Sequence, residues 1–313
     1  MDSQDSFSDK KVLLIDIGGT NIRTATADIG SNVINNASKQ NLDCLDSFDE
    51  IIQNLLSKDQ NIKHIVFSVA GPKINNSISM TNSELQIDRN YILENFKLDS
   101  CHILNDWESI GHSLSIVKNH ETKFINQGEP FNDVALVLGP GTGLGAALVI
   151  RDDIILPTEL GHSSISISKI IQELIPINEN DFNNIESIIS GKGLAKIFFL
   201  ISGLEKNPEE IVATYKSDKL AKKSIDIFLI SISQLLSELA LIYMPGKGIY
   251  LSGALIRTLV KFLDFDSFTK NFLENKKSPH KEILKQIPLA VVNKHMASLY
   301  GSLNFINKLN RKN

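Results

Sequence analysis

The sequence predicts an α/β protein in two halves, and three observations lead to this prediction. Short apolar runs with the length of strands alternate along the chain with longer amphipathic runs that are typical of helices. The stretches 12–23 and 134–148 each consist of an apolar run, a glycine-containing turn and a second extended run. The length of 313 residues allows two domains and a large core. We therefore expect an α/β domain in each half, with a ligand-binding cleft between the halves.

The first half begins with three extended segments joined by short turns, at 11–17, 21–28 and 31–37. A helix follows, because paired apolar residues recur four positions apart at 51–52 and 55–56. The apolar run 62–70 predicts the next strand, which the Gly71-Pro72 turn ends. The half is completed by a polar strand near 77–81, a helix near 88–97, a strand at 101–107 and a helix to about 117. The polar residues 1–9 are expected to be disordered.

The second half begins with a strand at 134–139, a glycine-rich turn and a returning strand at 143–151. A loop at 156–162 follows it. Apolar periodicity then predicts helices at about 168–175, 181–190, 192–202, 208–216 and 218–244. The rest is expected to form a strand at 248–253, three helices, a strand at 289–292 and a last helix from about 295. We expect a small α/β domain, 1–112 with the C-terminal helix 295–313, and a large α/β domain, 113–294.

Composition excludes several classes of partner. The formal net charge is −4 and Lys and Arg do not cluster with aromatic residues, so we expect neither nucleic acid nor a membrane as a partner. Cys44 and Cys101 have neither metal-site nor disulfide spacing and the N-terminus is polar, so we expect a cytoplasmic protein. The run 225–244 is long and apolar, but it contains Asp226 and Glu238, which favours a buried helix over a membrane span.

Two glycine-containing turns are candidates for binding phosphate. The second turn has glycines at 139, 141, 143 and 145, which let backbone amides approach an anion, although a tight hairpin between core strands explains them equally well. Asp16 ends an apolar strand beside the first turn, where it faces a metal-bound phosphate or closes its own turn. The second turn is not a Walker A loop, since no Lys follows Gly145, and it returns as a strand, unlike a dinucleotide fingerprint.

Further polar residues suit chemistry on hydroxyl groups. Asp106 lies at the end of a strand and can take a proton from a substrate hydroxyl while Asn105 holds a neighbouring one, or Asp106 is the N-cap of the next helix. Glu159, His162 and Glu186 lie in an apolar region, and sugar hydroxyls want several carboxylates and an imidazole. The Glu-x-x-His spacing also suggests a metal pair, but the sequence offers no third ligand, and His162 alone can be structural.

Five motifs in this order resemble those of the bacterial glucokinase family, in the superfamily of hexokinase, actin and the heat-shock chaperone ATPases. The resemblance runs from Leu14 to the last helix. The matching stretches are two phosphate motifs at 16–23 and 139–145, a catalytic motif at 105–109, a sugar motif at 156–162 and a Glu-containing motif at 186–194.

This resemblance implies an α/β, two-domain actin/hexokinase-like (ribonuclease H-like) fold with an interdomain cleft, and a glucokinase that phosphorylates the 6-hydroxyl of glucose. Asp106 would be the base, and the sugar would also contact Asn105, Glu159, His162 and Glu186. Asp16 would act on Mg²⁺ through water. ATP would contact Asp16, Gly18, Gly19, Thr20, Gly141, Thr142, Gly143 and Gly253. The partners implied are a hexose, ATP and a second copy in a homodimer.

Two stretches depart from the family pattern and support a second hypothesis. The adenosine-side motif usually has two glycines where this chain has Gly253-Ala254, and the usual Gly-Gly-Asn of the preceding helix is Ser237-Glu-Leu239. An altered adenine pocket would suit a sugar-sensing regulatory relative with weak or no turnover, although Asp16 and Asp106 are retained. A third hypothesis, an acid kinase, would require an Arg-rich substrate site instead of the Glu and His set.

Overall fold

The structure is a computed structural model that describes residues 10–42, 48–75, 77–79, 86–164, 171, 174–175 and 181–312. The predictions for 1–9, for 80–81 and for most of the helix at 168–175 lie outside the described residues. The chain divides into two compact units. Unit 1 comprises Met1–Ile116 and His295–Asn313, and unit 2 comprises Val117–Lys294.

Unit 1 is built on a five-stranded sheet in the order β3-β2-β1-β4-β8. The strands are β1 (Lys11–Ile17), β2 (Asn21–Asp28), β3 (Asn35–Asn41), β4 (Ile62–Val69) and β8 (Ser100–Asn105). β1 and β2 form an antiparallel hairpin, whereas β1, β4 and β8 run parallel. Ile17 pairs with Val69, and Val69 pairs with Asn105. The turn after β1 and the helix after β8 therefore begin at the same edge of this sheet.

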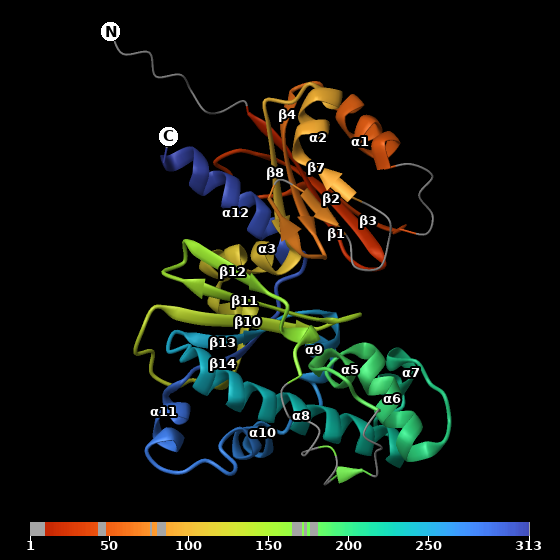
Figure 1. Ribbon diagram of the computed structural model, residues 1–313, viewed down its shortest axis with the longest axis vertical. Helices are drawn as coiled ribbons and strands as arrows, with labels where there is room; N and C mark the ends of the chain where they lie inside the picture. The colour runs from red at the N-terminus through yellow and green to blue at the C-terminus, as the bar shows by residue number, and fades with distance from the viewer. Residues whose placement is uncertain are drawn as a thin grey trace. The chain divides into compact units, whose positions relative to one another are not determined.

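Side chains that alternate along β1 fill two separate cores. Leu13 and Ile15 pack with α1 (Phe48–Ser57) and α2 (Arg89–Phe96). Val12 and Leu14 pack with α12 (Ala297–Lys312) on the opposite face. Figure 1 shows α12 on one side of the sheet and α1 and α2 on the other. Burial on both faces explains the continuous apolar run that β1 shows in the sequence.

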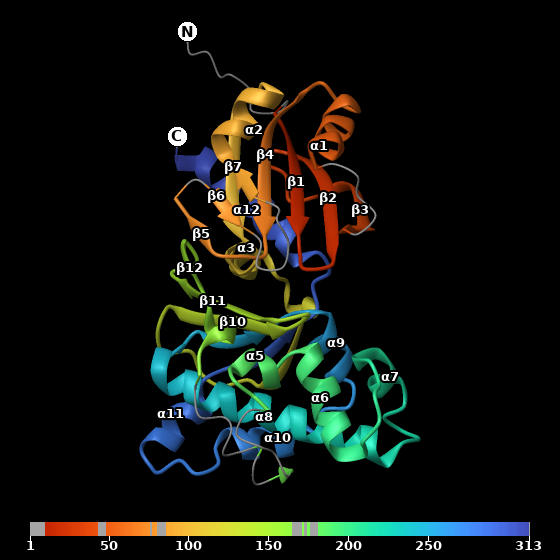
Figure 2. The ribbon, with the colours of Figure 1, turned by 45° about the vertical axis from the view of Figure 1, so that its right-hand side comes forward.

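The C-terminal helix α12 packs closely on α3 (Asp106–Ser113), which continues as the 3-10 turn η3 (Leu114–Ile116). Asn304 Nδ2 donates to the carbonyl of His112 at 2.7 Å. Gly301 permits the close approach, because a Cβ there would lie 1.7 Å from the carbonyl oxygen of Ser109. The same unit contains a small antiparallel sheet of β5 (Lys73–Ile74), β6 (Ser77–Ser79) and β7 (Gln86–Asp88), labelled in Figure 2.

Unit 2 is built on a six-stranded sheet in the order β12-β11-β10-β13-β14-β9. The strands are β9 (Thr122–Asn126), β10 (Val134–Pro140), β11 (Leu144–Ile150), β12 (Ile154–Thr158), β13 (Gly248–Leu251) and β14 (Leu289–Val292). β10 and β11 form an antiparallel hairpin, and β10, β13 and β14 run parallel. Leu138 pairs with Leu251, so the turn after β10 and the loop after β13 lie at the same edge.

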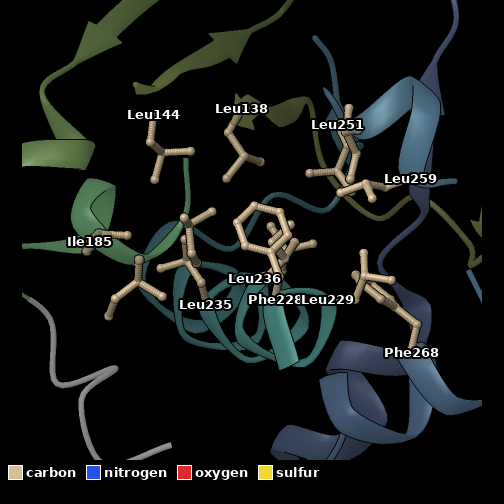
Figure 3. Close-up of a cluster of buried hydrophobic side chains, with 14 of the residues drawn as sticks. Leu138, Leu144, Ile185, Phe228, Leu229, Leu235, Leu236, Leu251, Leu259 and Phe268 are labelled. Atoms are coloured by element: carbon tan, nitrogen blue, oxygen red, sulfur yellow. The ribbon is translucent and has the colours of Figure 1, made fainter. Parts of the chain in front are cut away.

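The helices of unit 2 surround one core helix, α8 (Lys219–Tyr243). The other helices in the described part of unit 2 are α5 (Ile185–Ile188), α6 (Gly191–Ser202), α7 (Pro208–Ala213), α9 (Ala254–Leu259), α10 (Phe265–Phe272) and α11 (His280–Gln286), with the 3-10 turns η4 (Asn119–Glu121) and η5 (Leu160–His162). Figure 3 shows Phe228 and Leu236 of α8 among buried side chains from the sheet and its neighbours. By length and hydropathy α8 could cross a membrane, but 67% of its most apolar window is buried, as expected for a core helix.

Several elements differ from the sequence expectations for physical reasons. β3 begins at Asn35 rather than at 31, and all its residues are exposed, so no apolar pattern marks it. β12 occupies part of the expected loop; it is an edge strand, where Pro157 is tolerated. In place of a helix over 181–190, the described chain has only the short α5, because Asn184 caps its start and Ser190 caps the next helix.

Candidate active site

Asp16 is a buried carboxylate near the end of β1, with 3% of its surface exposed. Arg23 on β2 and Ser68 on β4 are its direct partners in the sheet register. Ser68 Oγ donates to Asp16 Oδ1 at 2.7 Å, and Arg23 Nη1 donates to Oδ2 at 2.6 Å. Both bonds cross to neighbouring strands rather than closing the turn. A cation and a hydroxyl therefore offset the cost of burying this charge.

The turn that follows Asp16 consists of Gly18, Gly19 and Thr20. The amide of Gly18 donates to the carbonyl of Asn21 at 2.9 Å, and Thr20 accepts a backbone hydrogen bond from Leu42 at 3.1 Å. A Cβ at Gly18 would have its nearest contact at 3.7 Å, which is ordinary van der Waals distance. Packing within the protein thus does not require a glycine at this position, which leaves room for a ligand to approach the backbone.

Asn105 and Asp106 begin α3, and the structure assigns the N-cap to Asn105 rather than to Asp106. Asn105 Oδ1 accepts from the amides of Trp107 at 2.9 Å and Glu108 at 3.3 Å, while Nδ2 donates to the carbonyl of Gly71 at 3.0 Å. The alternative that Asp106 is the N-cap is therefore wrong. Asp106 is the first helical residue, half-buried, and its Oδ1 accepts from the amide of Trp107 at 3.0 Å.

Glu108 completes a capping box beside this pair. Its Oε2 accepts from the amide of Asn105 at 3.1 Å, and Lys73 Nζ lies 4.0 Å from the same oxygen. Burial raises the pKa of Glu108 above its ordinary value, against the opposing effects of Lys73 and the Asn105 amide. Asn105 is thus fixed from both sides, and with it the start of the helix that carries Asp106.

The glycine-rich turn of unit 2 connects β10 to β11 through Gly141, Thr142 and Gly143. The amide of Gly141 donates to the carbonyl of Gly143 at 2.7 Å, and the carbonyl of Gly141 accepts from the amide of Gly191 at 2.9 Å. Gly141 and Thr142 are exposed. A Cβ at Gly141 would come no closer than 4.0 Å to another group, so space is available for a ligand. The turn forms the tight hairpin between core strands that was one of the two interpretations of its glycines. Because Gly141 and Thr142 are exposed, the turn is also accessible to a phosphate.

Gly143 has a different reason to be glycine. A Cβ there would lie 2.3 Å from Glu186 Oε2, a distance that real side chains do not adopt. The same oxygen accepts from the amide of Leu144 at 2.8 Å. Glu186 of α5 is therefore held against the glycine-rich turn, and Gly143 leaves the space for its carboxylate.

Glu159 and His162 lie together on the loop after β12. Glu159 precedes η5, His162 ends it, and His162 Nε2 is 3.9 Å from Glu159 Oε2. Their side chains are 55% and 49% exposed, respectively, so both can reach a ligand in solvent. The loop is joined to α5 because the amide of Ile185 donates to the carbonyl of Ser163 at 3.0 Å.

The segment after β13 also contains a predicted site glycine, Gly253. Gly253 has a φ of +117°, which favours glycine, and it is the N-cap of α9. A Cβ there would lie 3.2 Å from the carbonyl oxygen of Pro140, so Gly253 adjoins the glycine-rich turn. In the Ser237-Glu-Leu239 stretch on α8, Ser237 and Leu239 are buried core residues.

A cavity of about 550 Å³ lies elsewhere in unit 2, near the end of α8 and around the segment that precedes α11. Its lining residues are Leu241, Met244, Asn275, Lys276, Lys277, His280 and Ile283, none of which is a predicted site residue. Across the described residues, no three His, Cys, Asp or Glu side chains gather in a way that could hold a metal by themselves. The Glu159 and His162 pair thus has no third described partner of that kind.

The structure therefore groups the predicted site residues within each unit. In unit 1, Asp16, the 18–20 turn and Asp106 belong to one edge of one sheet. In unit 2, Glu186 lies against the glycine-rich turn, and the Glu159 loop is bonded to α5. Ser68 was not singled out from the sequence. The only signal for it was a hydroxyl within the apolar stretch 65–70, and strand register was needed to place it beside Asp16.

Comparison with solved structures identifies the fold. A glucokinase from an Antarctic psychrotroph has a TM-score of 0.79 at 22% identity, covering 96% of this chain and 99% of that one. The Balamuthia mandrillaris glucokinase in complex with glucose has a TM-score of 0.75 at 18% identity, covering 96% of this chain and 94% of that one. The fold is the two-domain actin-like α/β fold of sugar kinases, which confirms the fold class expected from the sequence.

Sequence comparison then identifies the family. The family model described as Glucokinase matches residues 13–309. The glucokinase of Brucella suis biovar 1 (strain 1330) is 30% identical over 324 aligned positions, covering 96% of this chain and 92% of that protein. The chain belongs to the glucokinase family and is a sugar kinase, a phosphotransferase that acts on a hexose.

Proposed function

We propose that this kinase transfers the γ-phosphate of ATP to the 6-hydroxyl of glucose. The observation that carries the proposal is the family match over residues 13–309, which includes all five motifs. Its relatives are named glucokinases, and the related structure from Balamuthia mandrillaris is described as a complex with glucose. The two exposed polar side chains of the 159–162 loop, a carboxylate and an imidazole, suit a neutral polyhydroxyl substrate.

Asp106 is proposed as the base that accepts the proton of the sugar hydroxyl. Phosphoryl transfer depends mainly on positioning and on charge stabilisation, and a carboxylate within reach of the attacking hydroxyl orients it. The capping box of Asn105 and Glu108 supports this role, because it fixes the first turn of the helix that carries Asp106. The side-chain Nδ2 of Asn105 carries a second hydrogen, which can donate to a neighbouring sugar oxygen.

Asp16 is proposed to act on the Mg²⁺ that accompanies ATP. Mg²⁺ keeps several waters and is usually held by one or two carboxylates and by phosphate oxygens. Each oxygen of Asp16 already accepts a hydrogen bond, from Ser68 and Arg23, and this fits a contact through water better than direct ligation. When bound, the ion would neutralise charge that develops on the phosphates. The 141–143 turn, in which Gly141 and Thr142 are exposed, and the 18–20 turn would bind the phosphates.

Asp106→Asn tests the assignment of the base. We expect the variant to lose roughly 10²- to 10⁴-fold in kcat while its affinity for glucose changes little, since the amide keeps the shape but accepts no proton. Asp264→Asn is the control, because Asp264 also lies at the start of a helix, as the N-cap of α10, and Asn preserves that cap. The control should keep full turnover. Asp106→Asn with an unchanged kcat would refute the assignment.

A second candidate function is a sugar-sensing relative with weak or no turnover. The observation that favours it is the Gly253-Ala254 and Ser237-Glu-Leu239 sequence, which departs from the family's adenosine side. A coupled assay over a panel of hexoses and nucleotides separates the two functions. Glucose binding without sugar phosphate formation at any nucleotide would favour the sensor. The proposal also includes a homodimer in the cytoplasm. Light scattering of the purified protein measures the number of subunits directly.

A further inference from the structure

One short segment of unit 2, residues 185–191, bonds to both of the loops proposed to hold substrates. The amide of Ile185 donates to the carbonyl of Ser163, at the end of the 159–163 loop, at 3.0 Å. Glu186 Oε2 accepts from the amide of Leu144 at 2.8 Å. The amide of Gly191 donates to the carbonyl of Gly141 at 2.9 Å. The segment thus joins the hydroxyl-binding loop to the glycine-rich turn through three hydrogen bonds.

Packing around these bonds leaves little room for independent movement. A Cβ at Gly161 would lie 2.4 Å from the carbonyl oxygen of Leu144 and 3.2 Å from Glu186 Oε2. A Cβ at Gly143 would lie 2.3 Å from the same carboxylate oxygen. The side chains of Leu144 and Ile185 are both buried in the core cluster that Figure 3 shows. The backbone on each side of the Glu186 bond is therefore anchored, and the carboxylate is the movable part between them.

We propose that Glu186 couples the two substrates: a hexose bound at its carboxylate fixes the glycine-rich turn and so raises the affinity for the nucleotide. The inference rests on the proposed function and extends it. A sugar hydroxyl that donates to Glu186 restricts the carboxylate and holds Oε2 on the Leu144 amide. This shapes the turn before phosphate arrives. By linkage, the nucleotide must raise the affinity for the hexose by the same factor.

Glu186 is therefore a positioning residue toward the nucleotide, since it acts through the Leu144 amide. Gly143 and Gly161 are glycines because a side chain at either position would displace the carboxylate or separate the two loops. Gly141 differs, because its open surroundings mark it as a direct contact for phosphate and not as part of the connection. This difference between two glycines of one turn makes the coupling testable.

The experiment measures binding of a non-hydrolysable ATP analogue with Mg²⁺ by calorimetry, without glucose and with saturating glucose. In the unaltered protein, glucose should tighten analogue binding roughly tenfold, within the usual range of coupling between sites. Gly143→Ala, which displaces Glu186, and Glu186→Asp, which shortens its reach by one methylene, should bring this ratio close to one. Gly141→Ala is the matched control and should weaken binding by the same factor in both conditions.

Loss of the ratio in Gly143→Ala and Glu186→Asp but not in Gly141→Ala would establish the connection. Three results would overturn it. They are a ratio of one in the unaltered protein, a ratio preserved in both test variants, and a ratio that falls in Gly141→Ala as much as in the test variants. Turnover of the unaltered protein in the same preparation tests the proposed function separately. Turnover without coupling would refute this inference alone, whereas Glu186-dependent coupling without turnover would support it and refute the proposed kinase activity.

Discussion

Ser68 Oγ donates a hydrogen bond to Asp16 Oδ1 at 2.7 Å, and the serine is fully buried. Ser68→Ala leaves a buried carboxylate oxygen without this donor. We expect the free energy of unfolding to fall by about 1.5–3 kcal/mol, the usual range for a hydrogen bond to a charged group. We also expect weaker Mg²⁺-dependent nucleotide binding, because Asp16 loses one of its two fixed contacts. Urea unfolding and calorimetry with an ATP analogue measure the two effects.

Ser233→Ala is the control for this prediction. Ser233 is likewise buried, and its hydroxyl donates to the carbonyl of Phe268 at 2.7 Å within unit 2. Its loss should lower stability and leave nucleotide affinity unchanged. If Ser68→Ala lowers stability alone, as the control does, the hydroxyl is structural and does not position Asp16 for the metal.

The Asn105 cap gives a second prediction. Asn105→Ala removes the acceptor for two helix amides and the donor to Gly71, and it should lower stability by about 1–2 kcal/mol. Turnover should fall as well, because the first turn of α3 carries Asp106. Asn105→Ser keeps a capping oxygen and should recover most of the stability. The emission of Trp107, the single tryptophan, reports urea unfolding of this region.

Asn207→Ala is the matched control, since α7 begins with the same capping box, in which Asn207 Oδ1 accepts from the amide of Glu210 at 2.8 Å. This variant should lose a similar amount of stability and keep full turnover. Equal losses of turnover in both alanine variants would show that the effect on activity follows from stability and not from the placement of Asp106.

The sequence predicted the fold class because both large sheets contain strands buried on two faces, whose continuous apolar runs are unmistakable. β1 and β10 are examples. Elements without such runs were missed or shifted. β3 is wholly exposed and polar, and β12 is a short edge strand that contains a proline. The core helix α8 was predicted because Asp226 and Glu238 interrupt its long apolar run, which favours a buried helix over a membrane span.

The candidate site was predicted in part, and the limit is again physical. Glycine turns and strand-end carboxylates are visible in a sequence because few core residues share their properties. The pairing of Asp16 with Ser68 is not visible, since it depends on the register of β1 and β4. Assignment of the N-cap to Asn105 or Asp106 depends on a one-residue choice of helix start, for which both side chains are suitable.

Glu108 supplies a prediction on pH. Burial raises its pKa in the folded protein above the ordinary value of about 4.3. At a pH between the ordinary pKa and the raised pKa, Glu108 holds a proton in the folded state that it has released in the unfolded state. This group therefore makes stability fall as pH rises through that window. Glu108→Gln cannot titrate and retains the capping contact to Asn105. From about pH 4 upward, the urea concentration at the unfolding midpoint of Glu108→Gln should rise relative to that of the unaltered protein.

Trp107 is next to Glu108 in sequence, and its emission is the probe of unfolding for both proteins at each pH. The difference between the two midpoints is the quantity of interest, because other carboxyl groups affect both proteins equally. Midpoints that change in parallel across the window would show that the burial of Glu108 carries no net cost in the folded state.

Gly301→Ala tests how α12 is held against α3. Helix propensity alone predicts that alanine inside a helix stabilises by about 1 kcal/mol relative to glycine. The structure predicts the opposite sign, because the new Cβ would lie 1.7 Å from the carbonyl oxygen of Ser109, on a backbone that cannot move aside. We expect a loss of about 3 kcal/mol or more as α12 is pushed from its site. Gly203→Ala is the control: its φ is +70° and its surroundings are open, so it should cost only about 1 kcal/mol from strain. A stabilised Gly301→Ala variant would mean that the two helices do not approach as closely as the structure has them.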